Sequence, residues 1–339
     1  MIKKTTIRDV AREAGVSVTL VSFVMNAKVK ENGELDCPVN ADTAERVLQV
    51  AKRLGYKRNN AAASLRSGRT HTIAVIMSDI SSPFFAEICR HLENIAFKAG
   101  YTVLFASSDE SAQKLSHLID KMIGYNVEGL IVAPCAGSEK VLHRSGTYNI
   151  PTVLIDRNIP GEEFGRVLVD NEAGGYEATK YLIGNGHTRI EIIGYDIEIA
   201  SVSDRVKGYE RAMKEAGLEA NIRVNVLPYG ISPSADEVAE VFRSAHARET
   251  DAFVLPTKKL SKSGFYAILK LNMRLPRDFE FVCYDESDVY DLIPPGIPHM
   301  VQPLHEIAEK SFNLLLDIID NKPAEMDVTL HSHLVKGGA

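Results

Sequence analysis

The chain has 339 residues, of which 45% are hydrophobic and 25% charged, and its formal net charge is −6. This composition is typical of a soluble globular protein, and the length allows two or three domains with full cores. Because no apolar run is long enough to cross a bilayer, and none follows Met1 as in a signal peptide, we expect a cytoplasmic protein without a membrane partner.

Charge is distributed unevenly along the chain. Residues 1–68 carry twelve Lys and Arg against seven Asp and Glu, a balance of +5, whereas the remainder carries −11. A small basic module on a larger acidic body is typical of a module that binds a polyanion, although chance variation also produces such a balance. The four cysteines lie far apart, and the His331-Ser-His333 pair is too sparse for a metal site, so we expect no cofactor and no disulfide.

The first predicted unit is a pair of short helices joined by a tight turn. Apolar residues recur at helical spacing between residues 7 and 14 and stop at Gly15, which favours a left-handed helix end. A helix-turn-helix needs this arrangement, because its second helix presents side chains to base edges; an ordinary helical hairpin is the alternative. Ser17 is the capping residue of the second helix. Its inward apolar residues are Leu20, Val21 and Val24, and its outward face carries Val18, Thr19, Ser22 and Phe23.

The next stretch predicts the rest of a small DNA-binding module. The polar segment from Lys28 to Pro38 predicts a loop or small hairpin with an Asn-Gly dipeptide at its tip. Asn40 then caps a third helix over 41–54, whose apolar face closes a core with the first two helices. The segment 56–68 has almost no face to bury, so we interpret it as a linker that becomes ordered only against a partner.

From residue 72 onward, apolar strands alternate with helices. Strands that are apolar on both faces indicate parallel sheets covered by helices, an α/β fold. Two consecutive series imply two lobes with a cleft between them, where ligands bind at the carboxyl ends of the strands. The first series has strands at 73–77, 101–106, 129–133 and 152–155 and helices at 84–99 and 110–125; the second has strands at 166–169, 189–194, 223–227, 252–255 and 280–283 and helices at 173–185 and 203–216.

Polar side chains gather at the expected carboxyl ends of these strands. Carboxylates, arginine and glutamine form paired hydrogen bonds with neighbouring hydroxyls, so a convergent set favours a polyol or sugar site in the cleft. Any one such residue alone is more often an ordinary loop residue. The set comprises Asp79, Ser82, Asp156, Arg157, Arg205, Asp285 and Gln302.

An ordered series of motifs runs almost from end to end of the chain. With this series the chain resembles the LacI/GalR (lactose-repressor type) family of bacterial transcription regulators. A lone helix-turn-helix would be weak support, whereas the ordered series is strong. The motifs are Ile7-Arg-Asp-Val-Ala11, Ala14-Gly-Val-Ser17, Val21-Ser22 with Asn26, Leu54-Gly-Tyr56, Asn60 to Leu65, Ser82-Pro-Phe-Phe85, Asp170-Asn171, Gly174-Gly175, Tyr181-Leu-Ile183, Gly186-His187, Arg189-Ile190, Arg205-x-x-Gly-Tyr209 and Gln302-Pro303.

The resemblance implies an architecture and a set of partners. It implies a homodimer that binds double-stranded operator DNA of near-palindromic sequence, and a small-molecule effector, a sugar or sugar phosphate, that changes DNA affinity. The implied parts are a headpiece over 1–58, a hinge helix and linker over 59–71, and a core like that of periplasmic binding proteins over 72–339, with a first lobe at 72–165 plus 300–322 and a second at 166–299 plus 323–339.

The resemblance also assigns residues to DNA and effector. Val18, Thr19 and Phe23 stand where the family reads base edges, and Leu65 matches the hinge leucine that inserts into the minor groove and kinks the duplex. Folding of the hinge would then be coupled to DNA binding. The other implied DNA contacts are Thr6, Ser17, Ser22, Asn26, Asn40, Asn60 and Ala62, and the implied effector residues extend the strand-end set by Phe84, Phe85, Ser201 and Lys258.

The chain departs from the family pattern in four places. Phe23 replaces a polar residue of many relatives; it can touch a thymine methyl group but cannot form a paired hydrogen bond with guanine, unless it packs on the following loop instead. That loop, Lys28 to Pro38, is longer than in most relatives. Lys258 and Lys259 replace an Asn-Asp pair, and they suit an anionic effector or, equally, are solvated lysines of a loop. No leucine heptad ends the chain, so no tetramer is expected.

Two other functions compete with DNA binding. An enzyme is disfavoured because no glycine-rich nucleotide motif follows a strand and no Ser-His-Asp or Cys-His set is present. A free solute-binding protein would fit the core but has no use for the headpiece. We therefore expect a DNA-binding transcription regulator, most simply a repressor, and not an enzyme.

Overall fold

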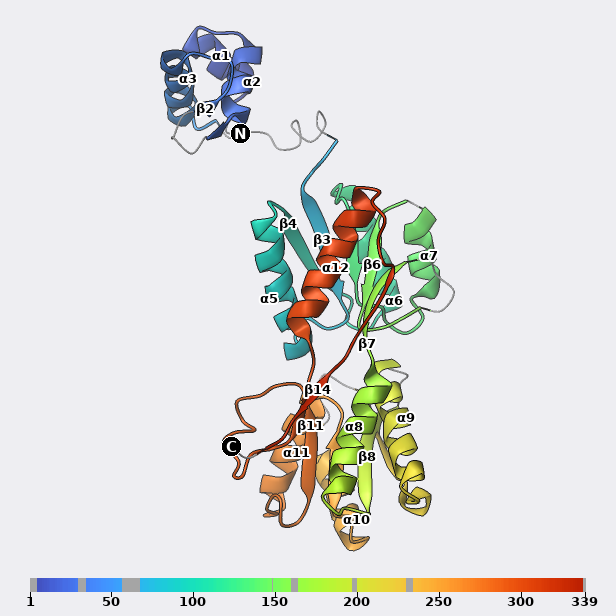
Figure 1. Cartoon of the computed structure of the whole chain (residues 1–339). Coiled ribbons are helices and arrows are strands. Elements are labelled where there is room, and N and C mark those ends of the chain that lie inside the picture. Colours follow the sequence, from blue (N-terminus) through green and yellow to red (C-terminus); the bar gives the residue numbers. More distant parts are fainter. Residues whose placement is uncertain are drawn as a thin grey trace. The chain divides into compact units, whose positions relative to one another are not determined.

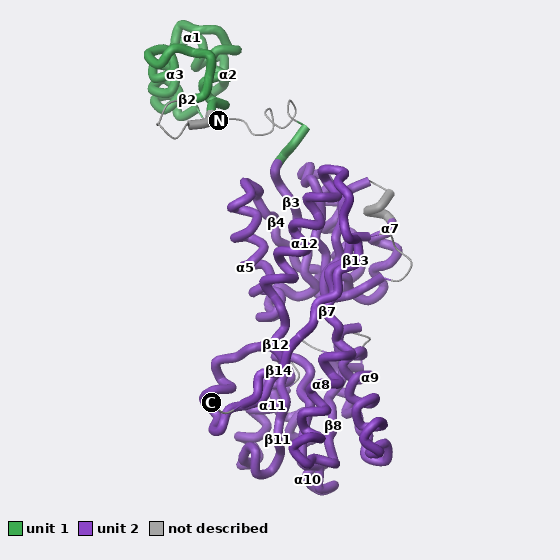
Figure 2. The backbone as a smooth tube through the Cα atoms, in the orientation of Figure 1, with its two compact units in different colours: residues 1–70 green, residues 71–339 purple. Residues whose placement is uncertain are grey.

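The computed structural model describes residues 5–29, 35–56, 68–147, 149–159, 164–196, 200–229 and 234–337. The chain divides into two compact units, residues 1–70 and 71–339, which Figure 2 colours separately. The second unit contains two six-stranded sheets, one in each of two lobes. In the part of the chain that the structure describes, no helix is both long and apolar enough to cross a bilayer.

The first unit packs three helices around one small core: α1 (Ile7–Ala14), α2 (Val18–Asn26) and α3 (Ala41–Arg53). Val10, Val21 and Val47 have no exposed surface in this core. Gly15 ends α1 with φ +67°, a left-handed conformation that glycine adopts at little cost. The Ser17 hydroxyl then accepts a hydrogen bond from the backbone of α2, so the predicted turn and cap are both present.

A short antiparallel ladder connects α2 to α3. β1 (Lys28–Val29) pairs with β2 (Leu35–Asp36), which confirms the hairpin alternative, and the expected hairpin tip lies outside the described residues. Asn40 caps α3 by accepting a hydrogen bond from the Thr43 amide at 2.8 Å. The helix-turn-helix therefore belongs to a closed three-helix unit rather than to an isolated helical hairpin.

The first lobe of the second unit is a parallel sheet with helices on both faces (Figure 1). Its strands are β3 (Thr72–Met77), β4 (Thr102–Ser107), β5 (Leu130–Val132), β6 (Thr152–Ile155), β7 (Gly165–Val169) and β13 (Asp327–Leu330). Its helices are α5 (Pro83–Lys98), α6 (Ala112–Gly124), α7 (Glu139–Thr147) and α12 (Leu304–Ile319). The strand order is β13-β7-β6-β5-β3-β4, with α5 and α12 over one face and α6 and α7 over the other.

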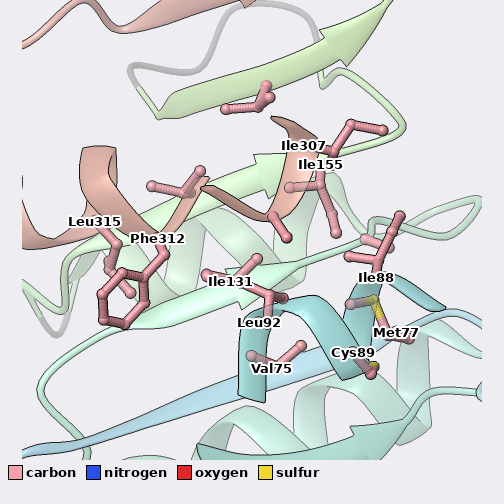
Figure 3. Close-up of a cluster of buried hydrophobic side chains, with 14 of the residues drawn as sticks. Val75, Met77, Ile88, Cys89, Leu92, Ile131, Ile155, Ile307, Phe312 and Leu315 are labelled. Atoms are coloured by element: carbon pink, nitrogen blue, oxygen red, sulfur yellow. The ribbon is translucent and has the colours of Figure 1, made fainter. Parts of the chain in front are cut away.

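The core beneath α5 and α12 holds together segments that are far apart in the sequence. Figure 3 shows Ile88 and Leu92 of α5 in one cluster with Phe312 and Leu315 of α12 and Val75 of β3. None of these five side chains exposes more than 1% of its surface. Burial of a side chain of this size contributes about 1.5–3 kcal/mol, so α12 is an integral part of the first lobe.

The second lobe repeats this plan. Its strands are β8 (Ile190–Tyr195), β9 (Val224–Leu227), β10 (Ala252–Leu255), β11 (Glu280–Tyr284), β12 (His299–Val301) and β14 (His333–Val335). Its helices are α8 (Asn171–Gly184), α9 (Ala200–Glu215), α10 (Ala235–Ala247) and α11 (Lys258–Lys270). The order is β14-β12-β11-β10-β8-β9, in which only β14 runs antiparallel; α10 and α11 cover one face, and α8 and α9 the other.

The lobe boundaries differ from the expected ones at three strands. β7 and β13 pair with each other in the first sheet, against the expectation that residues 166–169 and 327–330 belong to the second lobe. β12 pairs with β11 and β14 in the second sheet, although the first lobe was expected to resume at residue 300. Hydrogen-bonded partners decide which sheet a strand joins, and an apolar run does not encode its partner. The chain crosses between lobes at residues 170–171, 302–303 and 331–332.

Candidate nucleic-acid interface and effector site

The outward face of α2 carries side chains that the core of the first unit does not use. Val18 is 41% and Phe23 50% exposed, and Thr19 is exposed as well. Phe23 is therefore not packed away against the described part of the following hairpin. These three residues, predicted to read base edges, offer methyl, aromatic and hydroxyl groups but no paired donors for guanine.

Three of the predicted DNA contacts are helix caps. Thr6 forms a capping box with Asp9 at the start of α1, Ser17 caps α2 and Asn40 caps α3. A cap lies beside the free amides of the first helical turn, where a phosphate binds favourably. The hinge predictions for Asn60, Ala62 and Leu65 lie outside the described residues.

Ser22 is not on the outward face, contrary to expectation. It is 8% exposed, and its hydroxyl accepts a hydrogen bond from Nδ2 of Asn26 at 3.1 Å. The same Asn26 amide donates to the Ser22 carbonyl at 2.5 Å. This local pairing, one helical turn apart, gives the buried Ser22 hydroxyl a hydrogen-bond partner, and Asn26 remains exposed at the end of α2.

Every residue predicted to contact an effector lines a single cavity between the two lobes, with a volume of about 80 Å³. The lining residues beyond the predicted set are Glu110, Tyr195, Tyr229, Thr257 and Lys259. Sequence reasoning considered only Lys259 among them, with Lys258, as a lysine that suits an anionic effector, and missed the other four. Most of these also lie at or just after strand ends, and that position is the signal that would have found them. The predicted lining residues are Asp79, Ser82, Phe84, Phe85, Asp156, Arg157, Ser201, Arg205, Lys258, Asp285 and Gln302.

Arg157 lies between two carboxylates of the first lobe. Its guanidinium donates two hydrogen bonds to Glu110, at 2.7 and 2.8 Å, and its Nε is 3.3 Å from Asp156 Oδ2. Burial acts to lower the pKa of Arg157, but these carboxylates outweigh it and raise the pKa. Burial raises the pKa of Asp156 in spite of the neighbouring arginine. The positive charge of Arg157 is thus compensated within the protein.

Arg205, on α9 of the second lobe, also lines the cavity and is 4% exposed. Its Nε donates to Asn171 at 2.9 Å, one terminal nitrogen donates to the Pro256 carbonyl at 2.5 Å, and the guanidinium lies 4.0 Å from the ring centre of Tyr284. Helix α8 lies close against this residue, because a Cβ on Gly175 would be only 2.1 Å from the Arg205 carbonyl oxygen. This packing explains the second of the paired glycines, whereas a Cβ on Gly174 would meet the Tyr284 hydroxyl at 2.6 Å.

The crossover after β12 contributes open hydrogen-bond acceptors. Gln302 is 6% exposed; its Nε2 donates to Asp285 at 2.6 Å, and its Oε1 has no hydrogen-bond partner among the described residues. Asp285 follows β11 with φ +66°, as Asp156 follows β6 with φ +65°. Both aspartates thus have a left-handed backbone conformation at equivalent strand ends. A ligand that brings hydroxyl donors would satisfy the open acceptors of Gln302 and Asp285.

The two lysines begin α11 and are not solvated residues of a loop. Thr257 caps the helix, and Lys259 Nζ then lies 2.5 Å from Asp79 Oδ2 of the first lobe. Lys258 Nζ lies 3.4 Å from Oε1 of Glu87 on α5. Burial acts to raise the pKa of Asp79, but the hydrogen bonds from Lys259 and Ser81 outweigh it and lower the pKa.

Cysteines and metal-binding clusters contribute nothing to this site. Within the described ranges, no group of three or more His, Cys, Asp or Glu side chains is arranged to hold a metal ion. Burial raises the pKa of the Cys89 and Cys283 thiols to about 12, so both stay protonated at neutral pH and pack as small apolar residues.

Comparison with known families covers nearly the whole chain. Residues 6–59 match the family of bacterial regulatory proteins, lacI family. Residues 70–230 match the periplasmic binding proteins and sugar binding domain of LacI family, and residues 179–338 match the periplasmic binding protein-like domain. These boundaries follow the division between the helical unit and the two-lobed unit.

Individual relatives agree with these matches. Catabolite control protein A of Priestia megaterium is 28% identical over 332 residues, which cover 98% of this chain and 97% of that protein. The HTH-type transcriptional repressor PurR of Vibrio vulnificus is 29% identical over 332 residues, 97% of each chain. The lac repressor dimer bound to operator and the anti-inducer ONPF has the same fold, with a TM-score of 0.83 over 99% of this chain and 98% of that chain at 20% identity.

The matches and the geometry agree on one assignment. A headpiece with an exposed recognition helix precedes a two-lobed core with a polar cavity, and members of the matched family regulate transcription and are not enzymes. The chain therefore belongs to the LacI family of bacterial transcription regulators, with a helix-turn-helix headpiece and a core like that of periplasmic binding proteins.

Proposed function

We propose that this regulator is a cytoplasmic repressor that binds a near-palindromic operator as a homodimer and is switched by a small carbohydrate-like effector. The observation that carries the effector proposal is the convergence of strand-end polar residues from both lobes on one cavity. A ligand that touches both lobes binds one lobe arrangement better than another and shifts the population toward it. Such a shift would change how the headpieces are presented to DNA.

The cavity favours a neutral polyol over a phosphorylated sugar. Two cations of the cavity, Lys259 and Arg157, are already paired with carboxylates, so an anion would have to break an existing ion pair to reach them. A third, Arg205, already donates to Asn171 and to the Pro256 carbonyl. The open acceptor of Gln302 instead suits a hydroxyl. The description of the core family as a sugar binding domain also supports a sugar. A phosphorylated sugar remains the second candidate because of Lys258, whose pairing with a carboxylate is longer, at 3.4 Å.

A homodimer is supported by an exposed apolar surface on the second lobe. Tyr266 and Leu269 of α11 are 56% and 72% exposed, and Val289 and Leu292 after β11 are 45% and 76% exposed. Several of these side chains line a groove of about 510 Å³ beside α11. Contiguous exposed apolar side chains of this kind mark interaction surfaces in proteins that are otherwise soluble. We assign this surface to the second copy of the chain.

A thermal-shift screen of neutral sugars and sugar phosphates tests the effector proposal. Mass action requires that a true effector raise the midpoint of unfolding with its concentration. Asp285→Asn should weaken effector binding by about tenfold or more, because a neutral amide replaces a charged hydrogen-bond acceptor. Asp288→Asn, an exposed aspartate three residues along and outside the cavity, is the control. Equal affinity of both variants, or stabilisation by no sugar at all, would remove the cavity as the effector site.

Operator binding is tested separately by titrating DNA at several salt concentrations. The headpiece should neutralise several phosphates, so affinity should fall steeply as salt rises. Adding the effector found in the screen then distinguishes release of DNA from promotion of binding. DNA affinity that is independent of salt would contradict the proposed role of the headpiece.

A further inference from the structure

Two ion pairs cross the inter-lobe cleft, and α11 supplies the cation of both. Lys259 pairs with Asp79 just after β3, and Lys258 pairs with Glu87 on α5. The lysines belong to the second lobe and the carboxylates to the first. A weaker third link comes from the hydroxyl of Tyr229, which donates to Glu110 at 3.4 Å. Each of these contacts exists only while the lobes stand as close together as they do here.

The position of the lysines in their helix makes these partners necessary. The N-terminus of a helix carries partial positive charge, so cations in the first turn are unfavourable there unless they are compensated. Thr257 fixes the start of α11 by accepting a hydrogen bond from the Leu260 amide, and the Tyr195 hydroxyl lies 3.2 Å from its side chain. The carboxylates of the opposite lobe therefore remove a local repulsion in addition to forming ion pairs.

The Lys259–Asp79 pair is well oriented and mostly buried. Asp79 is oriented by Ser81, whose amide and hydroxyl both donate to it, at 2.9 and 2.6 Å. The side chains of Lys259 and Asp79 are only 16% and 21% exposed, whereas Lys258 and Glu87 are 25% and 47% exposed. Salt screens a partly buried pair less than an exposed one, so the Lys259–Asp79 pair should contribute most.

The cavity behind these pairs is small. Its volume of about 80 Å³ is well below the roughly 300 Å³ at which typical ligand pockets begin. An effector of sugar size would therefore need the lobes or the lining side chains to shift before it fits. The pairs lie across the cavity that an entering ligand must reach, since Asp79, Lys258 and Lys259 all line it.

We propose that Lys259 and Asp79, assisted by Lys258 and Glu87, form a clasp that holds the lobes closed in the absence of effector. The two lysines thus stabilise the closed arrangement of the lobes, so that no bound ligand is required for closure. Only the consequence for transcription rests on the proposed function: an effector would act on a population that is already mostly closed.

Distance measurements between the lobes test the clasp without DNA or effector. Fluorophores are placed on exposed positions of α6 (Lys121→Cys) and α10 (Glu240→Cys) in a full-length Cys37→Ser background, because the other cysteines are buried. The labelled chain is mixed with excess unlabelled chain so that each dimer reports one distance. Single-molecule energy transfer then gives the populations of closed and open lobes.

The wild type should be mostly closed, and Lys259→Met should raise the open-to-closed ratio by about fivefold or more. Asp79→Asn should have the same effect, and the double variant should add little, because both changes remove one pair. Lys310→Met, which removes an exposed lysine of α12, is the control. In the wild type, 1 M NaCl should shift the population in the same direction as Lys259→Met but by less, because salt screens the more exposed Lys258–Glu87 pair more than the Lys259–Asp79 pair.

The proposal fails if the ligand-free wild type is already open, or if Lys259→Met leaves the populations of open and closed lobes unchanged. Additive effects of the two single substitutions would show that the residues act separately and would also overturn it. These outcomes leave the proposed DNA and effector functions untouched, because neither ligand is present in the measurement.

Discussion

The close contact between α8 and α9 depends on a missing methyl group at Gly175. A Cβ at this position would meet the Arg205 carbonyl oxygen at 2.1 Å, and backbone atoms cannot move aside as a flexible side chain can. Gly175→Ala should therefore lower the free energy of unfolding by about 1–3 kcal/mol, as overpacking generally does. Because Arg205 lines the cavity, the same substitution should weaken effector binding. Urea unfolding and ligand titration measure the two effects.

Gly184→Ala, in the last turn of the same helix, is the matched control. An added Cβ there meets nothing within 4 Å, and the residue is exposed. Alanine should raise stability by about 0.5–1 kcal/mol, because glycine is the poorer helix former. If both substitutions changed stability equally, the contact with α9 would not require glycine at position 175.

Asp156 should give the core a characteristic dependence on pH. Burial raises the pKa of Asp156 above its ordinary value of 3.8, so the folded state binds its proton more tightly than the unfolded state. The contribution of this residue to stability is then fully present below about pH 4 and is lost as pH rises through the folded-state pKa. Asp156→Asn cannot titrate, so the stability of the wild type relative to this variant should fall as pH rises from 4 toward neutrality.

Urea unfolding of both proteins across this pH range measures that difference. A stability difference that is constant with pH, or that grows as pH rises, would show that the ion pair with Arg157 prevails over burial. The neighbouring Asp79 has the opposite shift, a lowered pKa, so its contribution is lost on acidification and cannot produce the same trend.

Among the elements, we propose that α2 determines which bases the headpiece prefers. Its exposed residues Val18, Thr19 and Phe23 lack paired donors, so the preferred half-site should be recognised through thymine methyl groups and shape. Phe23→Arg would introduce a paired donor and should favour guanine at the contacted position by about 1–3 kcal/mol. Selection of bound sequences from a randomised operator pool reveals the change.

Leu48→Arg on α3 controls for the added charge. Leu48 is 40% exposed and lies on α3 rather than on α2, so arginine there should leave the base preference unchanged. Identical selected sequences for wild type and Phe23→Arg would mean that residue 23 does not face the bases.

The elements that the sequence predicts well are those with a strong local pattern. The third helix was expected at 41–54 and lies at 41–53, because its cap and its apolar stripe are both local. Helix α11 is absent from the prediction, since it begins with two lysines and contains two serines and a glycine, which give it a weak apolar pattern. Its formation depends on the Thr257 cap and on tertiary burial of Leu260 and Ala267.

For the whole molecule, local patterns predict two lobes but not how strands are shared between them. The strand-end rule brings Asp79, Asp156 and Asp285 to one cavity, because parallel strands end at the same edge of a sheet. The partnership of Lys259 with Asp79, 180 residues apart, depends on the closed arrangement of two lobes and has no local signal. The assignment of β7 and β13 to the first sheet is non-local for the same reason.

The apolar surface of α11 leads to a prediction that links assembly to DNA binding. Leu269 is 72% exposed, so its replacement hardly affects the folded chain, whereas a glutamate would place an unpaired charge in the proposed dimer contact. Leu269→Glu should therefore be a folded monomer in analytical ultracentrifugation. Two linked headpieces bind a palindrome more tightly than one by about 100-fold or more, so operator affinity should fall by that order.

Val226→Glu is the control for this loss, because Val226 is 58% exposed on β9, at the opposite edge of the same sheet from β14. It should remain dimeric and keep full operator affinity. A dimeric Leu269→Glu would assign the contact to another surface. A monomeric Leu269→Glu with unchanged operator affinity would instead show that one headpiece suffices, because the palindrome adds affinity only when two headpieces are held together.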